Sequence, residues 1–125
     1  MERTYLTVVE LLAVHRQIID EFGGSKGVRD MGALEAAVFR PQTGYYDDAI
    51  AEAAALMESL ILIHPLVDGN KRVGLAAADI HLRLNDWMLL GDTESMADEI
   101  ITRLANGTFE RAWLDSCLRS RCEER

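Results

Sequence analysis

The chain has 125 residues, enough for one hydrophobic core but not for two, so we expect a single domain over residues 1–125. Apolar residues make up 49% and charged residues 27%, a composition that excludes a disordered protein. The formal net charge of −8 excludes a protein that coats nucleic acid, because such proteins neutralise phosphates with a basic surface.

The start of the chain and its apolar runs predict where the protein acts. No basic stretch followed by an apolar segment opens the sequence, and no apolar run is long enough to span a bilayer, so we expect neither a secretion signal nor a membrane partner. Cys117 and Cys122 lie five residues apart, a spacing that suits neither a local disulfide nor a zinc pair. We therefore expect reduced thiols and a cytoplasmic protein.

The N-terminal part predicts two helices. Thr7 and Glu10 form a capping box, apolar residues follow at helical spacing, and two glycines end the pattern, which indicates a helix over residues 7–22. A shorter helix follows, capped by Asp30. It stops before Pro41, because the residue that precedes a proline avoids helical angles.

Residues 40–47 are the least helical part of the chain. Threonine and tyrosine side chains there favour extended backbone, and Gly44 favours a bend. The pattern is typical of either a small flap hairpin or a plain connecting loop, and the sequence leaves both open.

Two strongly apolar helices are expected next, over residues 48–64 and from about 70 to 85. The first is apolar almost all round at residues 60–63, which predicts a central, buried helix. Pro65 ends it. Gly74 and several alanines should let the second helix pack closely against the first.

The C-terminal part predicts two more helices. Asp92 or Thr93 is expected to cap the fifth, which stops at residues 106–107, and Thr108 is expected to cap the sixth. The last few residues are expected to fray. The predicted fold class is therefore all-α, a compact six-helix bundle with a flap hairpin as the one candidate for strands.

The loop between the two apolar helices carries most of the reactive side chains, in the run His-Pro-Leu-Val-Asp-Gly-Asn-Lys-Arg over residues 64–72. His64 is a candidate general base, because imidazole titrates near neutral pH. Asp68 is a candidate ligand for Mg²⁺, which prefers oxygen ligands and nucleotide phosphates. Gly69 would let a phosphate approach the backbone.

Asn70, Lys71 and Arg72 open the following helix, whose free amides form an anion site to which the two cations add charge. Taken singly, each of these features is more often a helix cap, a turn or a solvated surface. Their joint occurrence between two buried helices favours phosphoryl or nucleotidyl transfer from a nucleotide to a hydroxyl.

The same run resembles the signature of the Fic/Doc superfamily, and its Asn-Lys-Arg ending resembles the Doc ("death on curing") branch. The similarity extends over the whole chain. It includes the Gly-Gly turn after the first helix, the Arg-Asp-x-Gly-x-Leu-Glu segment at residues 29–35, and the Arg-Pro-Gln run at residues 40–42.

This resemblance implies roles for single residues. It makes His64 the catalytic base, Asp68 the Mg²⁺ ligand and Arg72 a phosphate-binding arginine, with residues 69–70 as the anion nest. Lys71 stands where AMP-transferring Fic proteins have a glycine. Those proteins also have a second arginine three residues after the first, and this sequence has a leucine there, so both changes favour Doc.

A Doc-like protein would transfer the terminal phosphate of ATP, with Mg²⁺, to a threonine or serine hydroxyl of a protein target. The resemblance implies that this target is elongation factor Tu, that translation stops, and that the protein is the toxin of a toxin–antitoxin pair held inactive by a Phd-like antitoxin. Two alternatives stay open: AMPylation of a protein hydroxyl by the same loop, and a non-catalytic Fic-fold binding module. None of the three needs direct contact with nucleic acid.

Some features are less specific. Leu66 replaces the usual phenylalanine that anchors the loop in the core, and we expect it to keep the anchor with some loosening. The flap of the family would correspond to about residues 40–46, where the side chains that could contact target or antitoxin are Arg40, Gln42, Tyr45 and Tyr46.

Three further features are more typical of structure than of function. Residues 95–99 faintly resemble an autoinhibitory motif of some Fic proteins, but Ile100 departs from it. His15 and His81 lie on amphipathic helices, and we expect both to be structural.

Overall fold

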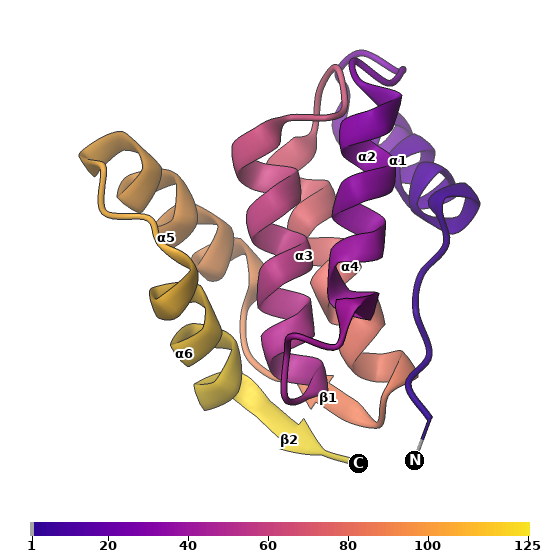
Figure 1. Ribbon diagram of the computed structural model, residues 1–125. Helices are drawn as coiled ribbons and strands as arrows, with labels where there is room; N and C mark the ends of the chain where they lie inside the picture. Colours follow the sequence, from indigo (N-terminus) through magenta and orange to yellow (C-terminus); the bar gives the residue numbers. More distant parts are fainter. Residues whose placement is uncertain (1) are drawn as a thin grey trace.

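The computed structural model describes residues 2–125, and within this range six α-helices form a bundle in which α3 is the central helix (Figure 1). No helix in this range combines the length and the hydropathy needed to cross a bilayer. The elements are α1 Val8–Phe22, α2 Met31–Phe39, the 3₁₀ helix η1 Arg40–Thr43, α3 Ala49–Ile63, α4 Asn70–Leu84, β1 Trp87–Leu89, α5 Thr93–Asn106, α6 Arg111–Arg121 and β2 Cys122–Glu124. The predicted all-α six-helix bundle is confirmed.

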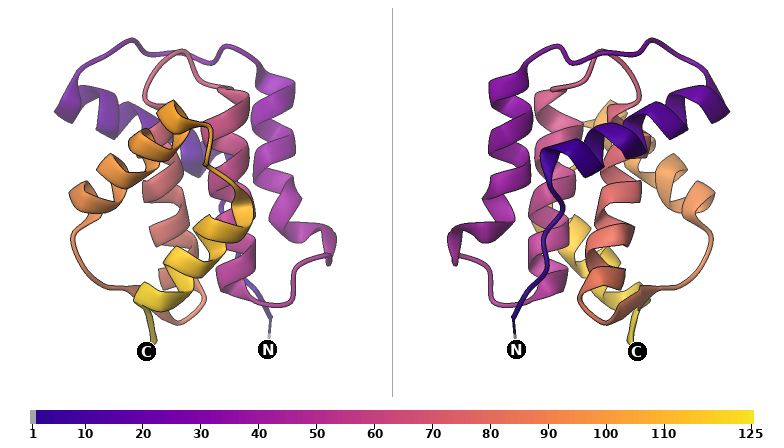
Figure 2. Two further views of the ribbon diagram at one scale, coloured as in Figure 1. Left: turned by 90° about the vertical axis from the view of Figure 1, so that its left-hand side faces the viewer. Right: turned by 90° about the vertical axis from the view of Figure 1, so that its right-hand side faces the viewer.

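Helix α3 lies at the centre because it contributes to two hydrophobic clusters. One cluster joins α3 to α4, α5 and α6, and the other joins α3 to α1, α2 and α4 (Figure 2). Eleven of its fifteen residues are buried. The prediction of a buried central helix is confirmed, and the helix carries the motif loop at its C-terminal end.

Gly74 lets α4 approach α3 closely. A Cβ atom at this position would lie 3.2 Å from Cγ1 of Ile61 and 3.5 Å from the carbonyl oxygen of Met57. A side chain at this position would crowd Ile61, so glycine suits the close contact between the two helices on which the loop is mounted.

Side-chain caps set most helix starts where the sequence predicts them. Thr7 forms the capping box of α1, and Asp30, Asp48 and Asp92 accept backbone amides at the starts of α2, α3 and α5. The predicted cap at Thr108 is wrong. The Thr108 amide donates to the Arg103 carbonyl at 2.9 Å, and this bond ties Thr108 to the C-terminal end of α5. Helix α6 starts only after Glu110.

The chain end is ordered into a strand, which corrects the prediction that it frays. Strand β2 pairs antiparallel with β1, and Leu89 lies opposite Cys122. Trp87, Leu89 and Cys122 pack against the cluster formed by α3 to α6, and this burial favours the ordered strand.

The segment 40–47 does not form the flap hairpin. Pro41 favours a helical turn at its start, and Gly44 ends that turn in the left-handed region with φ 81°. The Arg40 guanidinium then binds inside the fold, at 2.7 Å from the Tyr46 hydroxyl and 2.9 Å from the Ser59 hydroxyl. The turn lies beside the start of α3, whereas the motif loop follows its end (Figure 1).

A buried polar cluster ties the N-terminal segment to the bundle. Glu52 is 4% exposed, and its carboxylate contacts Arg3 at 2.8 Å and Nε2 of His81 at 3.0 Å, while the Tyr5 hydroxyl donates to it at 3.3 Å. Burial lowers the pKa of His81, although its hydrogen bond to Glu52 acts in the opposite direction. The imidazole is therefore neutral near pH 7 and donates its Nε2 hydrogen to the carboxylate.

Glu52→Ala is expected to lower the free energy of unfolding by about 3–5 kcal/mol, because it leaves the partners of a buried carboxylate unsatisfied. The matched control is Asp79→Ala, which removes an i, i+4 pair with the exposed Arg83 and should change stability by about 0.5 kcal/mol or less. Urea unfolding followed by circular dichroism measures both. Equal losses in the two variants would contradict the role given to the cluster.

Candidate active site in the loop between α3 and α4

Two residues in the left-handed region shape the motif loop. His64 ends α3 with φ 54° and ψ 57°, and Gly69 begins α4 with φ 79°. A glycine reaches this region freely, whereas a residue with a Cβ atom is disfavoured there by about 1–2 kcal/mol. The chain can thus turn sharply at both ends of the loop, and contacts from the rest of the fold must hold His64 in its conformation.

Asn70 holds the loop from inside. Its Oδ1 accepts from the Leu66 amide and its Nδ2 donates to the Leu66 carbonyl, both at 3.0 Å. The Asn70 residue is 8% exposed and Leu66 is 1% exposed within the cluster of α1 to α4. The expected anchor role of Leu66 is confirmed, and the Asn70 side chain is structural, which leaves only its backbone amide for an anion.

His15 of α1 holds the next part of the loop. Its Nε2 lies 2.9 Å from the Asp68 carbonyl oxygen, and because a carbonyl only accepts, this nitrogen carries the hydrogen. His15 is 3% exposed. The expected structural role is confirmed for His15 as well as for His81, and for His15 that role is to position the loop.

The Asp68 carboxylate is held by the backbone but stays exposed. Oδ1 accepts from the Gly69 amide at 2.9 Å, and Oδ2 accepts from the Ser25 amide at 3.2 Å. The Ser25 turn approaches so closely that a Cβ atom on Gly24 would lie 2.7 Å from Oδ2. Each oxygen retains a further lone pair for another ligand.

The donor set around Asp68 fits magnesium better than a metal with a preformed cage. Among residues 2–125 no three histidine, cysteine or carboxylate side chains lie close enough to share a metal ion. Mg²⁺ is commonly held by one or two carboxylates together with water and substrate phosphates. A single exposed carboxylate beside an anion site meets that requirement.

The first turn of α4 is open to an anion. Helices α1, α2, α3 and α5 begin with a side chain that accepts a backbone amide, whereas α4 begins at Gly69 without such a cap. The first amides of a helix have no partner within the helix and attract negative charge. The backbone of residues 70–72 is therefore available to a phosphate.

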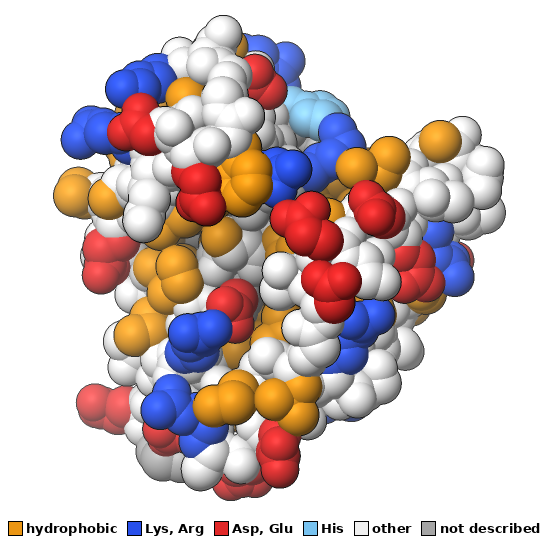
Figure 3. Space-filling model, turned by 180° about the vertical axis from the view of Figure 1, so that it is seen from behind, with side chains coloured by type: hydrophobic (Ala, Val, Ile, Leu, Met, Phe, Trp, Pro, Cys, Tyr) orange, Lys and Arg blue, Asp and Glu red, His pale blue; other side chains and the backbone are white. Residues whose placement is uncertain are grey.

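A cleft of about 260 Å³ opens at this turn, between α1 and α5. The space-filling view shows hydrophobic side chains lining a hollow, with basic and acidic side chains at its edges (Figure 3). The polar lining comes from residues 68–72 of the loop and α4, and from the carboxylates of Glu94 and Asp98 on α5. The apolar wall consists of Ile18, Ile19, Phe22, Ala97, Ile100 and Ile101.

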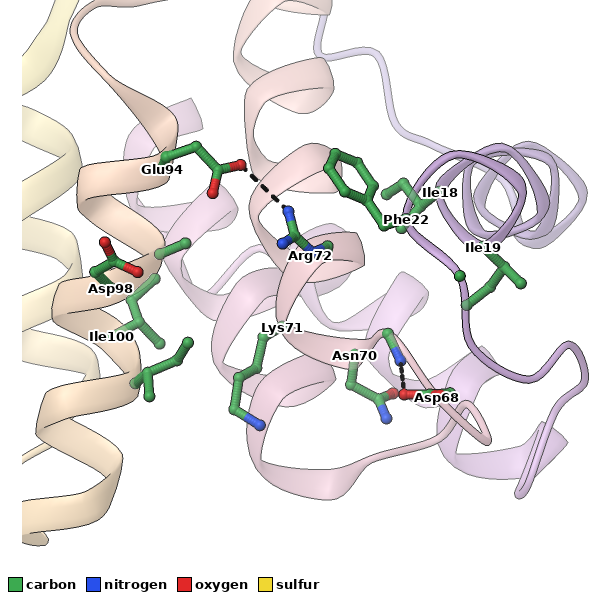
Figure 4. A pocket seen from close by; sticks show the side chains of 14 residues that line it. Ile18, Ile19, Phe22, Asp68, Asn70, Lys71, Arg72, Glu94, Asp98 and Ile100 are labelled. Atoms are coloured by element: carbon green, nitrogen blue, oxygen red, sulfur yellow. Dashed lines mark hydrogen bonds and ion pairs between the residues drawn. The ribbon is translucent and has the colours of Figure 1, made fainter.

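Arg72 and Lys71 both line the cleft, but only Arg72 is paired. The Arg72 guanidinium lies over the Phe22 ring, 3.9 Å from its centroid, and Nη1 is 3.2 Å from Oε1 of Glu94 (Figure 4). Lys71 extends into the space between α4 and α5. A phosphate that binds Arg72 would have to compete with the exposed Glu94 carboxylate, which precedes the segment 95–99.

His64 lies outside the cleft wall. It is exposed at the end of α3, and it is not one of the cleft-lining residues within the described part of the chain. The structure thus gathers Asp68, Gly69, Lys71 and Arg72 around one cleft and leaves His64 on the open surface. A base that acts on the hydroxyl of another protein has to be reachable in this way.

The side chains predicted to lie on the flap differ in how accessible they are to another protein. Arg40 donates a hydrogen bond to the Tyr46 hydroxyl. The centroid of the Tyr46 ring also lies 5.7 Å from the Arg111 guanidinium. Tyr45 is 76% exposed and Gln42 is exposed as well. Contact of these four residues with a target or an antitoxin stays a prediction, and the hairpin that was one of the two alternatives for this segment is not formed.

The segment beside the motif loop is instead the connection between α1 and α2. Val28 pairs with Leu66 as an isolated antiparallel bridge, and the Val67 amide donates to the Gly27 carbonyl at 3.1 Å. Both connections lie at the same end of the bundle (Figure 2). No short-range pattern in the sequence links this segment, Phe22 or Glu94 to the loop, so their contribution could not be predicted from the sequence.

Comparison with known proteins identifies relatives that share this region. The model of the Fic/DOC family matches residues 5–82, which is more than half of the chain and includes the whole motif loop. A curated protein named "Toxin Doc" from Mycolicibacterium smegmatis is 46% identical over 92 residues, covering 66% of this chain and 71% of the relative. "Protein kinase doc" of Escherichia phage P1 is 29% identical over 98 residues, covering 75% of this chain and 77% of the relative.

Proposed function

This chain belongs to the Fic/DOC family, and from that premise we propose that it is a Doc-type toxin that transfers the terminal phosphate of ATP to a hydroxyl of a protein. The names of its relatives, a toxin and a protein kinase, support this reading. The observation that carries it is the cleft in which the uncapped start of α4 meets Asp68, Lys71 and Arg72.

The cleft fits a nucleotide because it offers different chemistry on its two sides. The amides of residues 70–72 and the charges of Lys71 and Arg72 would bind the phosphates. The apolar wall, which includes Ile18 and Ile101, suits the weakly polar parts of the ligand. When ATP binds, Arg72 would exchange the Glu94 carboxylate for a phosphate.

Asp68 would hold Mg²⁺, which supplies positive charge that offsets the charge developing on the transferred phosphoryl group. The backbone amides of Ser25 and Gly69 orient the carboxylate for this role. Because both amides belong to the backbone of neighbouring turns, the ligand is preorganised by the fold itself.

His64 would accept the proton of the target hydroxyl. As this proton leaves, the hydroxyl oxygen bonds to the terminal phosphorus of ATP, and the bond from that phosphorus to the bridging oxygen breaks. The products are a phosphorylated serine or threonine and ADP. No nucleophile from this chain is required.

The surface around His64 suits a protein acceptor. Leu62, Ile63 and Val67 flank the histidine along the chain and are 47%, 49% and 51% exposed. Exposed apolar side chains around a reactive group are typical of a surface that docks another macromolecule. In keeping with the family resemblance, the proposed target is elongation factor Tu in the cytoplasm, and the proposed inhibitor is a Phd-like antitoxin.

The same loop could instead transfer AMP, but the position three residues after Arg72 speaks against it. AMP-transferring Fic proteins have a second arginine where this chain has Leu75, and Leu75 is 8% exposed within the core. The cleft thus has one arginine on α4 for the phosphates.

A labelled-ATP assay tests the proposed function. With Mg²⁺ and purified elongation factor Tu, we expect label to move to the factor from γ-labelled ATP and not from α-labelled ATP. Transfer of the α-label alone would establish AMPylation. Transfer of neither label, with binding to the factor intact, would establish a non-catalytic module.

A further inference from the structure

Arg29 lies in the connection between α1 and α2, yet its side chain reaches the end of α3. Its Nε donates to the His64 carbonyl at 2.7 Å, and its Nη2 donates to the Ile63 carbonyl at 2.6 Å. The backbone amides of Arg29 and Asp30 donate to the Pro65 carbonyl at 2.8 and 3.0 Å. Three consecutive carbonyls at the end of α3 thus bind to one short segment.

These contacts stabilise two unfavourable features of the loop, its unpaired carbonyls and the left-handed conformation of His64. The last carbonyls of a helix have no partner within the helix, and they attract positive charge. His64 occupies, with φ 54°, the conformation in which glycine usually ends a helix. Because a side chain disfavours that conformation, contacts outside the helix have to hold it.

From this arrangement we infer that Arg29 is a positioning residue for His64. Its guanidinium fixes the two carbonyls on either side of the His64 Cα atom, and so fixes the direction in which the chain presents the imidazole. The inference deepens the proposed function and rests on it, because it assigns to Arg29 an effect on the proton-transfer step. Arg29 does not line the nucleotide cleft.

The planar guanidinium is central to this role. Its two donors lie in a rigid fork, so that one side chain can bind two neighbouring carbonyls in fixed geometry. A lysine ammonium is a single point charge on a flexible stem, and it would keep the charge at the helix end while losing the fixed pair of bonds. Arg29→Lys should therefore restore only part of what Arg29→Ala loses.

Steady-state kinetics with γ-labelled ATP and the protein target test the inference. Arg29→Ala is expected to lower kcat on the order of 10- to 100-fold, because misplacement of a reacting group by about 1 Å has an effect of that size. The KM for ATP should stay within about 2-fold, because Arg29 is not part of the cleft. Arg29→Lys should fall between Arg29→Ala and the parent protein.

A readout that does not depend on activity is amide hydrogen exchange. In Arg29→Ala the amides of Leu66 and Val67 should exchange faster, while those in the middle of α3 stay protected. The matched control is Lys26→Ala, which removes an exposed pair with Asp20 from the same segment and should leave both kinetics and exchange unchanged.

The outcomes distinguish a failure of the inference about Arg29 from a failure of the proposed function on which it rests. An active parent protein in which Arg29→Ala matches Lys26→Ala in kcat would overturn the inference alone. A rise in the KM for ATP that accounts for the whole loss in Arg29→Ala would also overturn it, because the defect would then lie in the nucleotide site. A parent protein that transfers no γ-label would overturn the proposed function, and the exchange data would still report whether Arg29 holds the loop.

Discussion

His64→Ala is expected to lower phosphate transfer by about 10²- to 10⁴-fold, the range typical of the loss of a general base. Without the imidazole, the target hydroxyl has no positioned group to accept its proton as the new oxygen–phosphorus bond forms. Affinity for ATP should stay near that of the parent protein, because His64 lies outside the residues that line the cleft. Transfer of γ-label measures the first effect, and calorimetric titration with ATP measures the second.

A loss of stability has to be excluded as the cause of the lower transfer rate in His64→Ala. His64 is exposed, so its truncation should change the free energy of unfolding by about 0.5 kcal/mol or less. Val9→Ala, at a residue 76% exposed on α1, is a matched surface control with full activity expected. In cells, induction of His64→Ala should be harmless where the parent arrests growth. A variant as toxic as the parent would rule out the enzymatic account of toxicity.

Asp68→Ala is expected to lower transfer by on the order of 10² to 10³, because a metal that offsets phosphoryl charge contributes several kcal/mol and each 1.4 kcal/mol changes a rate tenfold. The Mg²⁺ concentration that gives half-maximal rate should rise, since the metal loses its protein carboxylate. The measurement is the transfer rate over a magnesium titration at saturating ATP.

Asp68 also accepts the Ser25 and Gly69 amides, so a loss in Asp68→Ala has two sources. Asp68→Asn separates them in part, because its single amide oxygen can still accept one of the two backbone amides while the charge that attracts the metal is gone. We expect Asp68→Asn to show the same shifted magnesium dependence. An unchanged dependence in both variants would refute the assignment of Asp68 as the metal ligand.

Much of the fold follows from signals within single helices. The capping box of Thr7 and Glu10 begins α1 as predicted, and the apolar run that ends at Pro65 marks α3 as the buried centre. The motif run also places Asp68 and Arg72 on one loop and the helix that follows it. These features are local, because a cap acts over three residues and an apolar face repeats within a turn or two.

Other features depend on contacts between distant residues, and these local signals could not predict them. Extended propensity at residues 40–47 left a flap hairpin and a plain loop both open, whereas in the fold Arg40 binds the Ser59 hydroxyl and the segment begins with a 3₁₀ turn. The last residues, which were expected to fray, form strand β2, because they pair with β1 more than thirty residues earlier in the chain.

The sequence by itself determined the starts of α1, α2, α3 and α5, the buried centre and the loop that carries a histidine, a carboxylate and two cations. Only the tertiary structure decided which distant groups hold that loop: Arg29 on the end of α3, His15 on the Asp68 carbonyl, and Phe22 and Glu94 on Arg72. The physical reason is one of range. Propensity, capping and periodicity act between near neighbours, whereas these contacts join residues 22 to 53 positions apart, and they form only when three-dimensional packing brings their helices to the same end of the bundle.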